Sequence, residues 1–318
     1  MIRALRPTDA LAYVAFRHQV TREADVEVAH AGRRGWGLPV VAGFFGRSLA
    51  LEPGRESWVQ IDHGRISGLV GAKRREGADV WDVDELVLVS SADAERTCTR
   101  LLEHMLSAAV DEGIQTVFLR LADDDPAQQW VRQVGFFQYC LETWYYRAEL
   151  PALASSPQQL GLRQRRPADH QSLFQLYCSV VPFRVRQAEG MTLHEWRWTD
   201  GWATRSVGVQ AVLGSSRVDY VRDGEGRLRT WLQVDHRRRQ LSLLSEVPEV
   251  ADLSAILRFG IARLGRGRSA WCAARDYQAG LGIALEDNDF VPARRYALFA
   301  RGLAARVPEL KLVPVRAS

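Results

Sequence analysis

Residues 80–147 constrain the fold more than any other stretch, because apolar strand and helix patterns alternate there without a break. Residues 84–89 are a short run rich in Val and Leu, which predicts a buried strand. Apolar residues then recur at three- and four-residue spacing up to Gly113 and predict an amphipathic helix; they are Leu101, Leu102, Met105, Leu106, Ala109 and Val110. Residues 114–121 predict a second strand. A strand, a helix and a strand of these lengths favour a parallel pair.

The pattern continues with another helix and an aromatic strand. Asp125 and Pro126 open the helix, since Pro suits a first-turn position and acids complement the helix dipole. Gly135-Phe136 ends the helix, and residues 139–150 predict a closing strand. This order predicts an α/β fold.

A hairpin is predicted upstream of this stretch. Residues 57–62 and 66–74 are two runs of alternating apolar residues, and a Gly-containing turn at residues 63–65 separates them. Val80 then starts the third strand of the meander.

A repeat links the two halves of the chain. Residues 2–9 read Ile-Arg-Ala-Leu-Arg-Pro-Thr-Asp, and residues 162–169 read Leu-Arg-Gln-Arg-Arg-Pro-Ala-Asp. Each copy predicts a short strand followed by a helix, because Pro presets the turn and Asp caps the start of the helix. The second half also repeats the later order of helix, strand, helix and aromatic strand, at residues 253–264, 269–275, 279–287 and 296–299.

Two tandem lobes follow from the repeat. They comprise residues 1–150 and residues 161–318, joined by a linker at residues 151–160 that has two prolines and no sustained apolar period. A chain of 318 residues, of which 47% are hydrophobic and 25% charged, is long enough for two cores of this kind.

Composition argues against several classes of protein. No apolar run approaches the ~20 residues that span a bilayer, and the first residues lack the apolar region of a signal peptide, so we expect a cytoplasmic protein without a membrane partner. The four cysteines lack metal-ligand spacing, so neither a metal site nor a disulfide scaffold is expected. Arginine supplies almost all of the positive charge, which suggests a GC-rich bacterial genome.

The basic run at residues 236–239, His-Arg-Arg-Arg, is the one feature that points to nucleic acid. Such a run can bind phosphates. No recognition helix, zinc-finger pattern or interleaved aromatic residue accompanies it. We therefore predict a solvated turn between two strands and no nucleic-acid partner.

The order of elements and two motifs resemble the acyl-CoA-dependent N-acyltransferases of the GNAT superfamily. One motif is Arg-Pro-x-Asp after the first strand, present at residues 6–9 and again at 166–169. The other is a helix that ends in Gly135-Phe136 before an aromatic strand. The resemblance covers roughly residues 1–150, with a fainter second copy behind it. It implies two GNAT-like lobes, each with a mixed, partly splayed sheet and helices on both faces.

The resemblance also implies where an acyl donor binds. In the family acyl-CoA lies beside the splayed strand, here residues 86–89, and the next helix offers its N-terminal amides to the pyrophosphate, as an anion site requires. The family's phosphate loop falls on residues 93–98, Asp-Ala-Glu-Arg-Thr-Cys, which lack both of its glycines and carry two acids. The implied ligand is acetyl-CoA or another acyl-CoA, and the candidate binding residues are Leu88, Val89, Arg96, Thr97, Cys98 and Thr99.

Candidate catalytic residues come from the same resemblance. Many family members use a carboxylate near the splayed strand as general base, which here implies Asp84 or Glu85; the alternative is that a carboxylate at a strand start is merely solvated. A tyrosine of the late helix is the usual general acid, but the matching positions hold Val131 and Leu285, which cannot donate a proton. Tyr145 on the closing strand is the substitute, although an aromatic residue on an alternating strand more often belongs to the core.

Two other features leave alternatives open. Cys98, near a helix N-terminus, is either a reactive thiol or, as its place on the same face as Leu102 favours, a buried one. Trp196, Trp198 and Trp202 form either a pocket together with nearby arginines or a packed insert. The sequence does not choose between the two interpretations of the tryptophans.

Two functions are consistent with these motifs. The first is an N-acyltransferase that moves an acetyl or acyl group from CoA to an amine of a small-molecule or peptide acceptor. The second is a catalytically silent tandem protein that binds a ligand or a partner. The altered phosphate loops of both lobes favour it, since residues 249–253 before the second lobe's helix also have no glycine and carry two acids. The fold alone does not choose between them, because function depends on the site.

Overall fold

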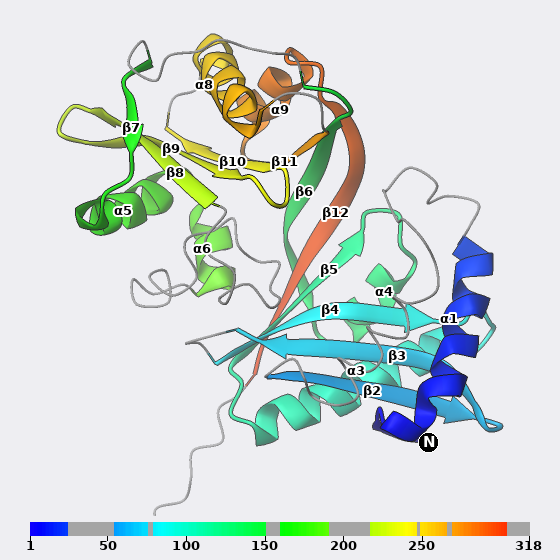
Figure 1. Ribbon diagram of the computed structural model, residues 1–318. Coiled ribbons are helices and arrows are strands. Elements are labelled where there is room, and N and C mark those ends of the chain that lie inside the picture. Colours follow the sequence, from blue (N-terminus) through cyan, green and yellow to red (C-terminus); the bar gives the residue numbers. More distant parts are fainter. Residues whose placement is uncertain are drawn as a thin grey trace, which may run out of the picture.

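The computed structural model describes residues 1–24, 54–75, 79–150, 160–190, 217–246, 249–265 and 269–303. Most of the predicted linker, residues 151–159, and the three tryptophans of residues 196–202 lie outside these ranges. Within the described residues the strands form one mixed sheet of 12 strands, with helices on both faces (Figure 1). The predicted α/β fold is confirmed.

The elements follow the predicted order. In the N-terminal half the strands are β1 (Ile2–Ala4), β2 (Arg55–Asp62), β3 (Arg65–Arg74), β4 (Val80–Leu88), β5 (Thr116–Ala122) and β6 (Phe137–Arg147), and the helices are α1 (Ala10–Ala24), α3 (Ala94–Asp111) and α4 (Ala127–Gln133). In the C-terminal half the strands are β7 (Leu162–Gln164), β8 (Arg217–Gly224), β9 (Arg227–Asp235), β10 (Gln240–Ser245), β11 (Ala270–Arg275) and β12 (Val291–Gly302), and the helices are α5 (His170–Val180), α6 (Phe183–Glu189), α8 (Val250–Leu264) and α9 (Ala279–Glu286). Predicted ends differ from these by a few residues.

The closing strand of each half lies in the sheet of the other half. The strand order is β1-β2-β3-β4-β5-β12-β6-β11-β10-β9-β8-β7. β12 pairs antiparallel with β5, β6 pairs antiparallel with β11, and β6 and β12 pair with each other. Figure 1 shows this long pair running from one lobe to the other. The two lobes therefore cannot separate without breaking backbone hydrogen bonds of the sheet.

The repeated Arg-Pro-x-Asp motif makes the same contacts in both lobes. Arg3 donates two hydrogen bonds to Asp9, at 2.7 and 2.6 Å, and Arg163 donates two to Asp169, at 2.7 and 2.8 Å. Each aspartate also accepts the backbone N–H of the arginine three residues before it, at 2.8 Å in the first copy and 2.6 Å in the second. The predicted role of Asp as the N-cap of the long helix is wrong: each aspartate instead closes the single 3-10 turn before the helix, as the third residue of a capping box, and Asp169 makes no side-chain cap hydrogen bond to α5. Its contacts tie each first strand to the helix that follows.

Left-handed residues close the tight connections. His63 and Gly64, with φ of 48° and 76°, form the predicted turn of the β2–β3 hairpin, where both central residues need positive φ. Gly135 has a φ of 89° after α4, and Asp289, at the matching place after α9, has a φ of 58°. Asp tolerates this conformation better than most residues, which explains how the motif survives without glycine in the second lobe.

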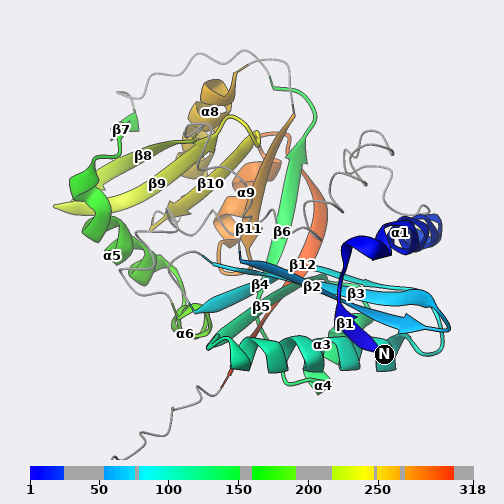
Figure 2. The ribbon, with the colours of Figure 1, turned by 60° about the horizontal axis from the view of Figure 1, so that its bottom comes forward.

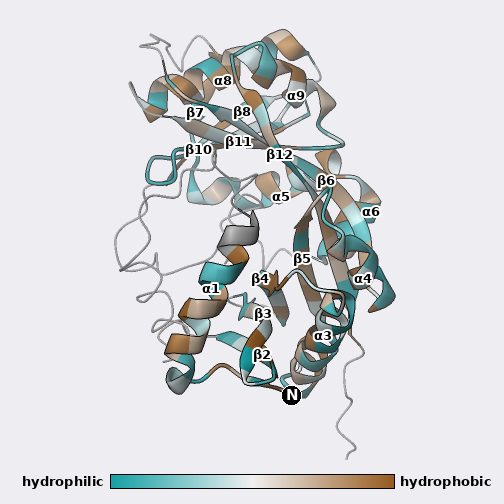
Figure 3. Cartoon of the chain, turned by 90° about the vertical axis from the view of Figure 1, so that its right-hand side faces the viewer, coloured by the Kyte–Doolittle hydropathy of each residue, from teal (hydrophilic) through white to brown (hydrophobic). Residues whose placement is uncertain are grey.

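Separate apolar clusters hold the helices on the sheet. In the N-terminal lobe α1 packs on one face, and α3 and α4 pack on the other (Figure 2). In the C-terminal lobe α8 and α9 cover one face, while α5 and α6 cover the other and contact both lobes. Figure 3 shows that α1 carries both apolar and polar residues along its length. None of the helices in the described ranges is long and apolar enough to cross a bilayer.

Two carboxyl groups meet where β2 passes the end of α3. Burial and the neighbouring Glu112 raise the pKa of Glu56 from 4.5 to about 7. A carboxyl group with a raised pKa stabilises the folded state below its unfolded pKa, and this contribution is lost as the pH rises from about 4.5 to about 7. We expect Glu56→Gln, which cannot ionise, to be more stable than the wild type at pH 8, by about 1 kcal/mol once solvent screening is included, and similar to it at pH 4.

Urea unfolding at pH 4, 6 and 8 measures this difference. Glu103→Gln is the control, because Glu103 is exposed on α3, the helix that ends next to Glu112. A Glu56→Gln protein whose advantage in stability does not grow with pH would contradict the raised pKa of Glu56.

Candidate functional site

Each lobe contains a split between two parallel strands. β10 and β11 pair only at Gln240↔Trp271 and Leu241↔Cys272, and they part beyond Leu241. β4 and β5 pair from Val80 to Val83 and then part in the same way. Ligands of open α/β sheets bind outside the carboxyl ends of such strands. The two splits are therefore the candidate sites.

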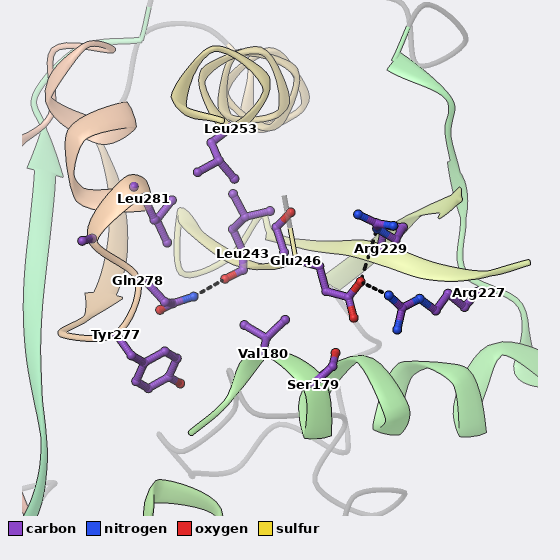
Figure 4. A pocket seen from close by; sticks show the side chains of 13 residues that line it. Ser179, Val180, Arg227, Arg229, Leu243, Glu246, Leu253, Tyr277, Gln278 and Leu281 are labelled. Carbon is purple, nitrogen blue, oxygen red and sulfur yellow. Dashed lines mark hydrogen bonds and ion pairs between the residues drawn. The ribbon is translucent and has the colours of Figure 1, made fainter. Parts of the chain in front are cut away.

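A cavity of about 590 Å³ lies at the split of the C-terminal lobe. We call it the C-terminal cavity. Figure 4 shows α5 below it with Ser179 and Val180, α8 above it with Leu253, and the junction of β11 and α9 at one side. Its polar lining residues are Ser179, Arg227, Arg229, Ser245, Glu246, Tyr277 and Gln278. It spans both faces of the sheet and is large enough for part of a cofactor-sized ligand.

Two arginines of β9, Arg227 and Arg229, line this cavity, which α8 borders through Leu253. Arg227 and Arg229 both pair with Glu246, at 3.1 and 3.2 Å, and Arg229 also donates to the exposed Glu225 at 2.8 Å. The side chain of Arg227 is 55% exposed, so a ligand can reach its guanidinium group. Guanidinium groups are suited to bind phosphate. The sequence pattern indicates only the start of the helix, whereas these residues lie on the neighbouring strand.

Tyr277 brings a phenol to the same cavity. It follows β11 directly, and its hydroxyl lies 3.5 Å from Nη1 of Arg275. Burial raises the pKa of Tyr277, so the phenol keeps its proton at neutral pH. Tyr277 lies before the late helix α9, outside the position that the family resemblance indicates. The signal was available, because Tyr277 stands just after a predicted strand whose carboxyl end borders a parallel neighbour.

A buried group of charged residues joins the lobes behind the cavity. Arg275 on β11 donates to Glu189 of α6 at 2.8 Å and lies 3.6 Å from Glu142 of β6. Tyr177 of α5 donates to Glu189 at 2.6 Å, and Arg120 of β5 donates to Glu142 at 3.2 Å. Burial lowers the pKa of Arg275, but these carboxylates raise it by more, so the pairs stay charged.

The predicted base candidates lie in the N-terminal lobe. β3 pairs with β4 so that Asp84 is the extra residue of a β-bulge. Asp84 forms an ion pair with Arg55, and Glu85 forms ion pairs with Arg55 and Arg17. The side chain of Glu85 is only 7% exposed, so the alternative of a solvated carboxylate is wrong for Glu85.

Tyr145 lies elsewhere, in the core of the C-terminal lobe, because β6 crosses into that sheet. Its hydroxyl lies 3.5 Å from the carboxylate of Glu286, and both line a cavity of about 230 Å³, which we call the Tyr145 cavity. Burial and Glu286 raise the pKa of Tyr145. The structure therefore does not bring Tyr145 together with Asp84 and Glu85, and the interpretation of a core aromatic is confirmed.

The candidate donor residues at the end of β4 are part of the packing. Leu88 is half-buried against the α3 face of the sheet, and Val89 against the α1 face. Thr99 is half-buried in the first turns of α3. Gly68 on β3 allows this close packing, since a Cβ there would lie 2.7 Å from Thr97 and 2.8 Å from Leu101.

The N-terminus of α3 carries charged side chains of both signs and has no net positive charge, since Arg96 is accompanied by Asp93 and Glu95. Arg96 is exposed and pairs with Asp93, while Thr97 is buried and accepts a hydrogen bond from Gln60 at 3.2 Å. Cys98 is fully buried, and burial raises its pKa to about 12. The buried thiol is confirmed, and a reactive thiolate at Cys98 is excluded at neutral pH.

The basic run lies in the predicted turn, between β9 and β10. Asp235 accepts the backbone N–H groups of Arg237 and Arg238, at 3.0 and 2.9 Å. Arg239 donates to the carbonyl oxygens of Leu264 and Gly265, so it caps the end of α8. This residue therefore has a structural role. Among the described residues, His, Cys, Asp and Glu side chains form no group of three that could hold a metal ion.

Solved structures with the same fold are GNAT acetyltransferases. A GCN5-related N-acetyltransferase from Sphaerobacter thermophilus aligns over 95% of this chain and 95% of its own, with 16% sequence identity and a TM-score of 0.57. A candidate acetyltransferase from Pyrococcus horikoshii aligns over 96% of this chain and 89% of its own, with 12% identity and a TM-score of 0.52. At these identities the likeness shows the fold: this chain consists of two tandem lobes of the GNAT type.

A tandem GNAT protein from the clavulanic acid biosynthesis pathway aligns over 95% of this chain and 98% of its own, with 14% identity and a TM-score of 0.48. No protein-family model matches the sequence, and no curated protein sequence does. The assignment of the fold therefore rests on three-dimensional similarity, together with the splits and the repeat described above.

Proposed function

We propose that this chain, built of two GNAT-type lobes, is an acyl-CoA-dependent N-acyltransferase whose C-terminal lobe holds the acyl donor. The observation that carries the proposal is the C-terminal cavity. It combines an open strand edge, a helix N-terminus, two arginines and a protonated tyrosine at one split between parallel strands. The acceptor is an amine of a small molecule or a peptide.

The lining of the cavity suits the chemistry of an acyl-CoA. Its phosphates carry negative charge, which Arg227 and Arg229 of the cavity lining can bind. In the reaction the amine nitrogen forms a bond to the thioester carbon, the C–S bond breaks, and the proton of the amine leaves to a base or to water. CoA departs as a thiol. Holding both reactants in line supplies much of the rate enhancement.

We propose that Tyr277 is the hydrogen-bond donor to the departing sulfur. Its phenol lines the cavity and keeps its proton, so it can donate a hydrogen bond to the thiolate as the C–S bond breaks. Arg275, 3.5 Å from the hydroxyl, holds it in place.

A donor site in the N-terminal lobe is the competing assignment. It would use Asp84 or Glu85 as base and Arg96, Thr97 and neighbouring residues at the mouth of α3. Glu85 is buried between two arginines, and Asp93 and Arg96 pair across the helix mouth. These contacts favour the C-terminal lobe.

Calorimetric titration with acetyl-CoA tests the proposed function directly. We expect binding in the micromolar range at one site per chain. Absence of binding at millimolar ligand would remove the enzyme hypothesis and leave the silent binding protein. The acids at both helix mouths, Asp93 and Glu95 before and in α3 and Glu249 and Asp252 at α8, are the observation that favours this second candidate.

Tyr277→Phe tests the role of the phenol. With an amine acceptor found by screening small-molecule and peptide amines, we expect kcat to fall by about 100-fold while the KM for acetyl-CoA changes little, because the hydrogen bond forms to the leaving group. Steady-state kinetics measures both constants. Tyr145→Phe is the matched control variant, and its kcat should stay within about threefold of the wild type. A larger loss of kcat in Tyr145→Phe than in Tyr277→Phe would assign the hydrogen bond to the leaving group to Tyr145 instead.

A further inference from the structure

We propose that the side chain of Gln278 closes the split between β10 and β11. It must be displaced when the pantetheine arm of an acyl-CoA enters this split. The inference rests on the proposed function, since it concerns the same cavity. It assigns to Gln278 control over the affinity for a linear ligand that carries amide groups.

Gln278 spans the two strands at the point where they part. Its Nε2 donates to the carbonyl oxygen of Leu243 at 3.0 Å, and its Oε1 accepts the backbone N–H of Arg275 at 3.1 Å. Leu243 is the second residue after Leu241, where the backbone pairing of β10 and β11 ends. The side-chain amide of Gln278 therefore takes the place of the missing ladder hydrogen bond on this edge of β10.

The same side chain stands between two cavities. Gln278 and Ala279 line both the C-terminal cavity and the Tyr145 cavity. Figure 4 shows the Gln278 amide pointing at Leu243 across the split.

An open strand edge binds extended, amide-bearing chains, because its free backbone groups pair with those of the ligand. The pantetheine arm of acyl-CoA is such a chain and contains two amide groups. A ligand amide N–H that lies along β10 would need the Leu243 carbonyl, which already accepts the amide of Gln278. Ligand and side chain compete for one acceptor, so the hydrogen bond of Gln278 lowers the affinity for the ligand.

The N-terminal lobe offers a matched control. After β5 the corresponding junction holds Asp125, whose carboxylate accepts the Ala127 N–H at 2.8 Å and caps its own helix. Gln128, on α4, donates to the carbonyl oxygen of Ala122 at 2.8 Å. Gln128→Ala therefore removes a glutamine-to-carbonyl hydrogen bond of similar length that does not bridge a split.

The test uses calorimetric titration of the full-length wild type, Gln278→Ala and Gln128→Ala with two probes. Acetyl-CoA carries the arm, whereas adenosine 3′,5′-bisphosphate has only the nucleotide end. We expect Gln278→Ala to bind acetyl-CoA about three- to tenfold more tightly than the wild type, the equivalent of one neutral hydrogen bond. Binding of the bisphosphate should be the same in all three proteins, and Gln128→Ala should match the wild type with both probes.

Unchanged or weaker acetyl-CoA binding by Gln278→Ala, with normal binding by the wild type, overturns the inference and leaves the proposed function intact. A wild type and a Gln278→Ala protein that both fail to bind acetyl-CoA overturn the proposed function and this inference with it. Amide hydrogen exchange gives an independent readout: the N–H of Arg275 should exchange faster in Gln278→Ala, and also in the wild type once acetyl-CoA is bound.

Discussion

Replacing Arg275 by alanine should lower the free energy of unfolding by about 3–5 kcal/mol, the usual cost of removing one partner from a buried ion pair. Arg275 is 2% exposed in its side chain and Glu189 is fully buried. Without the guanidinium, the carboxylates of Glu189 and Glu142 lose their shared partner and remain buried. Urea unfolding followed by circular dichroism at pH 7 measures the change.

The location of Arg275 explains why the effect is large. It joins α6 to β11 and lies beside Glu142 on β6, the strand that crosses between the lobes. Arg96→Ala is the control, since the Arg96 and Asp93 side chains are 71% and 67% exposed and an exposed pair contributes about 0–1 kcal/mol. Equal losses in the two variants would show that Arg275 does not hold the lobes together.

Replacing Arg227 and Arg229 together by alanine should weaken acetyl-CoA binding by about 10- to 100-fold. Hydrogen bonds to charged groups contribute about 1.5–3 kcal/mol each, and partial exposure of Arg227 reduces that contribution here. Glu246 now pairs with both arginines, so Glu246→Gln should act in the opposite direction and tighten binding. Calorimetric titration measures all three proteins.

Arg96→Ala separates the two lobes in the same titration. If the donor binds in the C-terminal cavity, removal of Arg96 at the mouth of α3 should change the affinity by less than about twofold. The reverse pattern, with a large loss in Arg96→Ala and none in the double variant, would place the donor in the N-terminal lobe, beside Leu88, Val89 and residues 96–99.

Local features of this fold were predictable because they depend on neighbours in the chain. The spacing of Leu101, Leu102 and Met105 predicts α3, and the turn at His63 and Gly64 needs only two residues that accept positive φ. The Arg-Pro-x-Asp motif acts over four residues, so a turn closed by its aspartate before a helix could be predicted in both lobes.

The candidate site was less predictable, since its parts come from distant segments. The place of Asp84 and Glu85 on a strand was predictable from the sequence. Their arginine partner Arg55 was not, because it precedes Asp84 by 29 residues and Glu85 by 30. The cavity that carries the proposed function takes Ser179 from α5, Arg229 from β9 and Tyr277 from the end of β11. No periodicity connects these positions.

The sequence by itself determined the elements, their order, the repeat and the motif that begins each lobe, because the periods of strands and helices and the chemistry of turns act over a few residues. Only the tertiary structure decided that β6 and β12 change places and that Arg275 meets Glu189 across 86 positions of the chain. It also decided that the C-terminal split holds the cavity with two arginines. Strand partners and buried ion pairs depend on which surfaces meet after the chain has folded. The apolar patterns of β6 and β12 are similar, so the local sequence of each strand fits either sheet equally well.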